Sequence, residues 1–296
     1  GNDAWQSITD IAVPAGTHTL EFAEGSGPYF CDNWNMEQNT TTVNLNGCEL
    51  TGAVNPNSAT YQWNASGSGT NEYYLTLNGG GNPTLATVNC ATIKGLFQEE
   101  SAEDKPNHQL YNGTGGYNLG GMANHRLGWG DNDSLGYSTL YVRDDDQDPD
   151  SLDIKIAQVT EILDSNLRNT LITNGTMSYA NARIANSRHS AGFTQTYRRI
   201  IFKYANDHAV EFTGQGDGRL EFCLGYFTGH RFVQDNDISD IYLLNCMSVY
   251  AHLFIIFGAA STAGTKTIEN SLDWGSFAGS MDAGAIGYTL DENHNC

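Results

Sequence analysis

The sequence predicts an all-β chain folded as a right-handed parallel β-helix, a solenoid in which each coil stacks on the one before it. Two observations favour this fold. Charged residues make up only 16% of the 296 residues and 33 residues are glycine, which suits many short strands joined by turns rather than long helices. In the second half of the chain, aromatic residues also recur at intervals of about two dozen positions, which is the length of one β-helix coil.

The recurrence is clearest in residues 151–296, the predicted regular coils. Its aromatic members are Tyr179, Tyr204, Tyr226, Tyr250 and Trp274, which follow one another at nearly equal intervals. Equivalent residues of successive coils stack about 4.8 Å apart, so these five side chains are expected to form one column. Polar residues at the following turn are expected to form another column, with Asn181 over Asn206.

Two further columns flank the aromatic one. The residues two positions before it are Met177, Phe202, Leu224, Ser248 and Leu272, and those six positions after it are Ala185, Val210, Phe232, Ile256 and Ser280. Their largely apolar character predicts inward-facing ladders. The period is too short for helical repeats of 33 or more residues, and the signature of leucine-rich repeats, which share the period, is missing.

The first half of the chain repeats less regularly. Asn46–Gly52 resembles Asn89–Gly95 at a distance of about two coils, so residues 1–99 are predicted to form N-terminal coils. Residues 100–150 are polar and rich in turn-forming residues, and they are predicted to leave the coil as a long loop. The whole chain is then one β-helix domain; the alternative is that residues 1–150 form a separate β-rich module.

Charge restricts the partners. The net charge is −20, with only 14 Lys and Arg, and nucleic-acid binding needs a basic surface that is not visible here. The longest apolar run, Leu253–Ala260, is far shorter than the 18 or more residues of a membrane span. We therefore expect no nucleic-acid partner and no membrane span. An acidic surface keeps a protein soluble, and we expect an extracellular location: secreted, on a cell or on a virion.

The cysteines and glycosylation sequons are compatible with that location. No cysteine pattern has the spacing of a zinc site. Cys223 and Cys246 precede two of the repeated tyrosines by three and four residues, so they are expected on adjacent coils, either as a disulfide or as two buried thiols. Candidate N-glycosylation sites are Asn39, Asn64, Asn112, Asn132 and Asn174.

The opening segment, Ile8–Leu20, resembles the first coil of pectate-lyase-like β-helix proteins. Pro14 and Gly16 stand where those proteins turn into their first strand, which the resemblance places at Thr19–Phe22. The family includes polysaccharide lyases, glycoside hydrolases, phage tailspikes and adhesins. The resemblance thus implies the fold but leaves the function open.

Basic residues concentrate on the regular coils of this otherwise acidic chain. They are Arg183, Lys203, His208, His230 and Arg231, with His252 nearby. Lyases that act on uronic-acid chains neutralise the sugar carboxylate and remove the adjacent proton, for which Arg and then His or Lys are suited. Arg183 or Arg231 is the predicted carboxylate clamp, with His208, His230 or Lys203 as the base and His252 as a substrate contact. The alternative is a set of ordinary solvated side chains or histidines that cap turns.

Hydrolase chemistry ranks below lyase chemistry. It needs two carboxylates at a defined separation, and the Asp-Asp signature of polygalacturonase-type hydrolases is absent from these coils. If the chain is an enzyme, we therefore expect a polysaccharide lyase rather than a hydrolase. The calcium-binding aspartates that accompany the catalytic arginine of pectate lyases are not recognisable on these coils, which argues against that specific lyase activity.

Two further candidates lie in the predicted loop. Its acidic cluster comprises Asp144, Asp146, Asp148 and Asp150, which could bind Ca²⁺ through hard oxygen ligands or could be a solvated loop. Trp129, between two glycines, could stack on a sugar ring; core packing is the alternative.

Two functions remain from the sequence. The first is an extracellular protein that binds, and by β-elimination cleaves, an acidic polysaccharide. The second is a non-enzymatic structural subunit, such as a virion spike, adhesin or filament protomer, whose β-helix packs against copies of itself. The apolar run Leu253–Phe257 favours the second function. Not all of its side chains can point inward, so some are expected to contact a partner.

Overall fold

The protein forms two compact units, and each is described by itself. The structure is a computed structural model. The first unit comprises Gly1–Gly52 and Val159–Cys296, and the second comprises Ala53–Gln158. The structure describes residues 16–34, 41–54, 63–65, 71–76, 96–99, 113–115, 126–132, 137–143, 145, 153–157, 159–165, 169–236, 240–251, 253–257, 264–275, 281–283 and 289–293.

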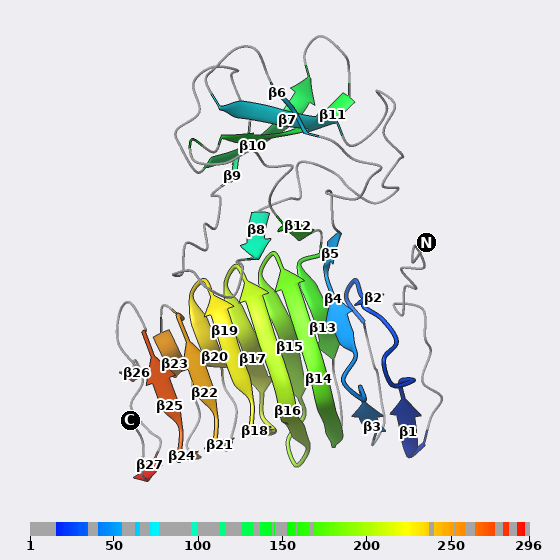
Figure 1. Ribbon diagram of the computed structural model, residues 1–296. Coiled ribbons are helices and arrows are strands. Elements are labelled where there is room, and N and C mark those ends of the chain that lie inside the picture. Colours follow the sequence, from blue (N-terminus) through cyan, green and yellow to red (C-terminus); the bar gives the residue numbers. More distant parts are fainter. Residues whose placement is uncertain are drawn as a thin grey trace. The chain divides into compact units, whose positions relative to one another are not determined.

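The first unit is a parallel β-solenoid of about six turns, which confirms the predicted fold class (Figure 1). Strands β14 (Thr170–Ala180) and β15 (Arg183–His189) belong to one coil, and β16 (Thr194–Ala205) and β17 (His208–Gly214) belong to the next. β14 pairs with β16, and β15 pairs with β17, both in parallel. Every coil therefore adds one rung to each of two sheets.

The larger sheet has thirteen strands. Besides β14 and β16 they are β1 (His18–Glu21), β2 (Tyr29–Phe30), β3 (Thr41–Asn44), β4 (Glu49–Thr51), β18 (Asp217–Glu221), β19 (Leu224–Thr228), β21 (Ile241–Leu244), β22 (Met247–Val249), β24 (Thr265–Glu269), β25 (Leu272–Trp274) and β27 (Thr289–Asn293). The smaller sheet has six strands. Besides β15 and β17 they are β13 (Glu161–Ser165), β20 (Arg231–Asn236), β23 (Leu253–Phe257) and β26 (Met281–Ala283).

A left-handed residue bends each coil in the middle of the larger sheet. These residues are Asn174, Arg199, Phe222, Asn245 and Asn270, with φ between 49° and 59°. The strand register aligns them from coil to coil. Asparagine tolerates this conformation better than most residues, which explains why three of the five are Asn. The bend lets one sheet cover two sides of the hydrophobic core.

The aromatic column exists, but its predicted membership is partly wrong. Lys203 pairs with Tyr226, and Tyr226 pairs with Val249, so Tyr226 lies one residue before the column. Val249 in turn pairs with Trp274, so Trp274 also lies one residue before it. The stacked rings are Tyr179, Tyr204, Phe227 and Tyr250, with successive centroids 4.9, 6.0 and 5.0 Å apart. All four have positive φ, so they occupy the turn between the two sheets.

The same one-residue shift corrects the flanking columns. Phe202 pairs with Gly225 rather than Leu224, and Val210 pairs with Val233 rather than Phe232. A Cβ on Gly225 would lie 2.2 Å from the Phe232 ring. Glycine at this inward position therefore leaves room for Phe232 in the core. Further along the chain, Val233 pairs with Ile255 and not with the predicted Ile256.

The second unit is inserted into a single coil of the solenoid. The chain leaves the coil at Gly52 and re-enters it at Val159. Thr51 pairs with Ser178, so Gly52 takes the place that Tyr179 has in the next coil. A Cβ on Gly52 would lie 2.1 Å from Val159 Cγ2 and 2.4 Å from the Tyr179 carbonyl oxygen. Only glycine fits where the departing and returning chains meet.

The inserted unit contains two small sheets. One has the order β6 (Asn64–Ala65), β7 (Glu72–Thr76), β11 (Tyr137–Arg143), β10 (Arg126–Asn132) and β9 (Gly113–Gly115). The other has the order β5 (Ala53–Val54), β12 (Asp153–Ala157) and β8 (Leu96–Glu99). The predicted loop of residues 100–150 lies within this unit, which begins well before it. No helix among the described residues is long and apolar enough to cross a membrane.

An ion pair lies inside the solenoid. Lys266 Nζ of β24 is 2.9 Å from Asp235 Oδ2 of β20, and both side chains are fully buried. Lys266 belongs to the larger sheet and Asp235 to the smaller one, so the pair crosses the interior. A buried charge without its partner is strongly unfavourable, and each residue therefore requires the other.

We predict that Asp235→Ala lowers the free energy of unfolding by about 3–5 kcal/mol, because it removes the buried carboxylate that pairs with the buried Lys266 ammonium. Urea unfolding at neutral pH measures the loss. The double variant Asp235→Leu/Lys266→Met should recover most of it. Asp164→Asn is the matched control: its partner Arg188 is half-exposed, so the change should stay below about 1 kcal/mol. Equal losses in the two single variants would contradict the prediction.

Candidate functional site

Four of the five predicted catalytic residues converge on the first residues of β15, β17 and β20. Arg183 pairs with His208, and His208 pairs with Arg231, so these three residues form one column over three coils. His230 was predicted to stand in this column; it instead lies one residue earlier, in the turn, where its backbone N–H donates to the Asp207 carbonyl. The reason is again the one-residue shift after Tyr204.

Arg183 is held between two carboxylates. Its Nη1 lies 2.6 Å from Glu161 Oε1 of the preceding coil, and its Nε contacts Glu211 Oε2 of the following coil. Asn186 Nδ2 donates to Glu161 Oε1 at 3.3 Å, and Asn236 Nδ2 donates to Glu211 Oε1 at 2.5 Å. Burial raises the pKa of Glu211, and the Arg183 charge opposes that rise. The positive charge of Arg183 is thus largely balanced within the protein.

Arg231 extends this network to the next coil. Its Nη1 donates to Gln234 Oε1 at 2.5 Å and lies 3.4 Å from His208 Nε2. Gln234 Nε2 in turn donates to Asn236 Oδ1 at 2.9 Å. We call the connected side chains the polar strip; they are Glu161, Arg183, Asn186, Asp207, His208, Glu211, His230, Arg231, Gln234 and Asn236. The polar strip spans β13, β15, β17 and β20.

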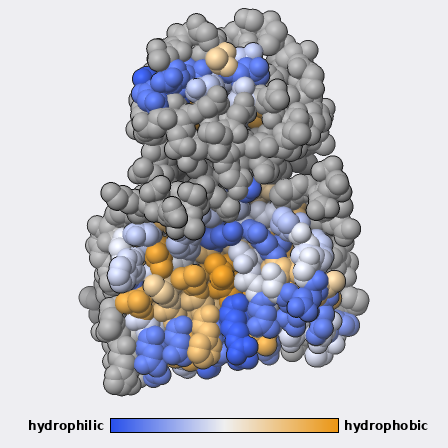
Figure 2. Space-filling model, in the orientation of Figure 1, coloured by the Kyte–Doolittle hydropathy of each residue, from blue (hydrophilic) through white to orange (hydrophobic). Residues whose placement is uncertain are grey.

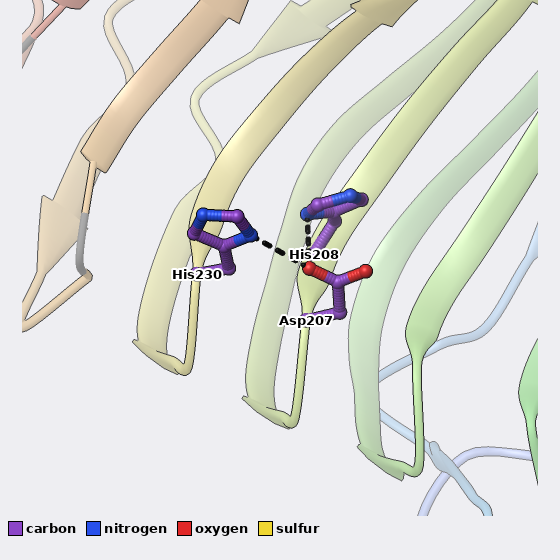
Figure 3. Close-up of side chains that lie close together, drawn as sticks. All are labelled: Asp207, His208 and His230. Atoms are coloured by element: carbon purple, nitrogen blue, oxygen red, sulfur yellow. Dashed lines mark hydrogen bonds and ion pairs between the residues drawn. The ribbon is translucent and has the colours of Figure 1, made fainter.

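One end of the polar strip is a cluster of Asp207, His208 and His230 (Figure 3). His208 Nδ1 and His230 Nδ1 lie 3.1 and 3.0 Å from the same oxygen, Asp207 Oδ1. The two imidazole centroids are 5.7 Å apart. Each residue offers one ligand atom within 4.8 Å of the others, so these three residues could hold a metal ion.

The two imidazoles differ in exposure. The His208 side chain is 5% exposed and the His230 side chain is 41% exposed. Burial lowers the pKa of His208 to about 4; the Asp207 carboxylate opposes this, whereas Arg231, His230 and Arg183 add to it. His208 is therefore neutral at physiological pH, with its ring nitrogens available as donor and acceptor.

Lys203 does not join the polar strip. It lies on β16 of the larger sheet, with Nζ 3.6 Å from Glu49 Oε1 and over the rings of Tyr179 and Tyr204 at 5.7 and 5.8 Å. Lys203 was predicted as a possible base only because it is adjacent to Tyr204 in the sequence. The predicted substrate contact His252 and the predicted calcium ligands Asp144, Asp146, Asp148 and Asp150 lie outside the described residues. Trp129 lies on β10, but its side chain is not described.

Cys223 and Cys246 lie on adjacent coils, as predicted. The residues that follow them, Leu224 and Met247, pair with each other. Both are free, buried thiols, and burial raises the pKa of Cys223 well above its usual value.

Of the predicted glycosylation sites, Asn64 is exposed. Asn174 donates to Asn44 Oδ1 at 3.1 Å. The side chains of Asn39, Asn112 and Asn132 are not described.

An apolar face, which the sequence did not predict, covers part of the larger sheet (Figure 2). Ile201, Leu224, Met247 and Leu272 pair in one register column. Ile201, Phe222 and Trp274 are the exposed large hydrophobic side chains of the described residues. We call these six residues the apolar face. The alternation that would have revealed it is obscured because the strand segments here are short.

No family model, curated protein or solved structure matches this chain. The fold therefore rests on the strand register, and the candidate site rests on the contacts of the polar strip. Neither is inherited from a relative.

We predict that the stability of the protein, measured in the presence of a chelator, falls as the pH falls from 6.5 to 4. The pKa of His208 is about 4 in the folded state and about 6.5 when unfolded, so the unfolded chain binds more protons in this window. The full contribution, about 3 kcal/mol, is present above pH 6.5 and is lost towards pH 4. His208→Gln should flatten this part of the curve. An unaltered slope in His208→Gln would contradict the assignment.

Proposed function

We propose that this chain is an extracellular, pectate-lyase-like β-helix protein that binds an acidic polysaccharide along the polar strip. The observation that carries the proposal is the convergence of Arg183, His208, His230 and Arg231 on neighbouring coils. A solenoid offers a chain-like ligand the same side face on every coil. An extended glycan suits such a face because its residues also repeat along one direction.

The chemistry of the polar strip suits sugar hydroxyls as well as carboxylates. Gln234 and Asn236, which are partly exposed, supply acceptors and amide donors. Arg231 is the better partner for a uronate carboxylate, since Arg183 is already balanced by two glutamates and a guanidinium has five N–H donors in a planar fork. Cleavage by β-elimination is the reaction we propose to assay, because it needs a cation at the carboxylate and a proton acceptor beside it.

We predict that Arg231→Gln weakens the binding of a polyuronate by about tenfold or more, as expected for the loss of a charge-assisted hydrogen bond. Calorimetry against a panel of uronic-acid and neutral polysaccharides measures binding. The ultraviolet absorbance of unsaturated products reports cleavage in the same samples. Arg198→Gln is the control, because Arg198 pairs with Glu221 on the larger sheet. Equal affinity of Arg231→Gln and the unmutated protein would refute the proposed binding face.

A structural subunit is the second candidate, and the apolar face supports it. Trp274 is 59% exposed, and Ile201 and Phe222 are also exposed. Exposed apolar patches often mark protein–protein contacts. In this proposal the face packs against the same face of a second copy, as two flat sheets do at a spacing of about 10 Å. The net charge of −20 opposes such association and is screened by salt.

We predict, for the second candidate, that the protein sediments as a dimer or larger assembly at physiological salt and that Trp274→Glu makes it monomeric. The substitution places a charge in the proposed contact, where leaving it without a partner is unfavourable. Tyr242→Glu, on β21 of the same sheet but outside the apolar face, serves as a comparison that should keep the assembly. A monomer at all concentrations would exclude the second candidate and leave the polysaccharide proposal standing.

A further inference from the structure

We propose that Asp207, His208 and His230 bind a divalent first-row transition metal ion such as Zn²⁺ through one carboxylate oxygen and two imidazole nitrogens. Asp207 is the last residue of the turn before β17, and His208 is the first residue of β17. His230 occupies the equivalent turn position of the next coil, directly before β20. The stacking of coils therefore brings together ligands that are a full coil apart in the sequence.

The separations of the Asp207 carboxylate oxygen from the two imidazoles suit such an ion. Asp207 Oδ1 lies 3.1 Å from His208 Nδ1 and 3.0 Å from His230 Nδ1. A tetrahedral ion with bonds of 2.0–2.1 Å separates its ligand atoms by about 3.4 Å. These two carboxylate–imidazole distances need to open by only a few tenths of an ångström, and the ligand atoms of the two imidazoles lie within 4.8 Å of each other. Backbone hydrogen bonds from His230 and Arg231 to the Asp207 carbonyl, 2.9 and 3.0 Å long, fix the two turns against each other.

The orientation of His208 points to a shared ligand. Its Nδ1 is buried and has no hydrogen-bond partner, although Asp207 Oδ1 is only 3.1 Å away. The distance suits a hydrogen bond but the angle does not. A nitrogen that binds a metal ion shows this arrangement, because its lone pair points at the ion and not at the neighbouring ligand atom. His230 Nδ1, which forms a hydrogen bond with Asp207 Oδ1 at 3.0 Å, would exchange that bond for the ion. The metal ion would satisfy the buried His208 nitrogen, which otherwise carries a desolvation penalty.

The electrostatic surroundings include both favourable and unfavourable charges. Glu211 and Glu161 lie on the same strip, and Asp207 supplies a negative charge in the cluster itself. Arg231 Nη1, 3.4 Å from His208 Nε2, opposes a cation. When His208 coordinates a metal through Nδ1, its proton is on Nε2, which then no longer accepts from Arg231. Arg231 keeps its hydrogen bond to Gln234 Oε1. Overall the protein, at −20, attracts cations.

The ligand types select the metal. Two imidazoles with one carboxylate suit Zn²⁺, Co²⁺, Ni²⁺ or Cu²⁺, whereas Ca²⁺ and Mg²⁺ prefer oxygen ligands throughout. Three protein ligands leave at least one coordination position for a water or substrate oxygen. The partly exposed His230 and Asp207 side chains place that position towards solvent. A uronate carboxylate could occupy it, an extension that rests on the proposed function; metal binding itself does not.

The test uses the full chain after removal of metals by a chelator. Titration with Zn²⁺ should give one high-affinity ion per chain, and Co²⁺ should give a visible absorption band. His230→Gln and Asp207→Asn should each weaken binding by more than about tenfold, a loss that even outer-shell changes can produce, and should abolish the band. His18→Gln is the control and should behave like the unmutated protein. Circular dichroism verifies that the partly exposed His230→Gln variant remains folded.

Two results would overturn the metal site: no saturable binding by the unmutated protein, or unchanged affinity and spectrum in both His230→Gln and Asp207→Asn. Arg231→Gln separates this proposal from the proposed function. It removes the predicted glycan contact but no ligand atom, so it should lose polysaccharide affinity and retain the Co²⁺ band. Loss of the band in Arg231→Gln, with the fold intact, would contradict ligation at these nitrogens.

Discussion

Parallel backbone pairing between successive coils is the constraint on which the rest of the structure depends. It fixes which residue stands over which, because each strand of one coil hydrogen-bonds to the equivalent strand of the next. The buried ladder, the bend in the larger sheet and the polar strip are all consequences of that register. Arg183, His208 and Arg231 would have no relation to one another without it. The geometry of the polar strip is thus inherited from the backbone.

The fold class followed from the period of the aromatic residues, but the register did not. Tyr226 and Phe227 are adjacent aromatics, and the sequence contains no signal that favours one over the other. The strand pairing places Phe227, and not Tyr226, over Tyr204. The interval from Tyr204 to Phe227 is therefore two residues shorter than the interval from Tyr179 to Tyr204. Side chains alternate along a strand, so an error of one residue moves a side chain to the opposite face. Leu224 was accordingly predicted inside but lies on the apolar face.

The candidate site was predicted only as a set of residue types. His208, His230, Arg183 and Arg231 stood out because cations are rare in this chain, and four of the five catalytic candidates do converge. Asp207 was missed as their partner, since one aspartate among 34 acidic residues carries no distinguishing signal. The role of two glutamates in balancing the charge of Arg183 was not predicted, for the same reason. Rare residue types can be singled out from a sequence, whereas common ones acquire their role only through three-dimensional neighbours.

The aromatic turn shows how this architecture accommodates additional domains. Gly52 and Gly275 occupy the positions of the ring in the coils that flank Tyr179–Tyr250, so the stack of rings ends in a glycine on either side. At one of these ends the short turn is replaced by the whole unit Ala53–Gln158. The departing and returning strands meet at Gly52 and Val159. Bringing the two ends of so long a connection together costs conformational entropy, and the folding of the inserted unit itself offsets that cost. A solenoid of this kind can therefore acquire, exchange or lose such a guest at a turn without altering the stacking of its remaining coils.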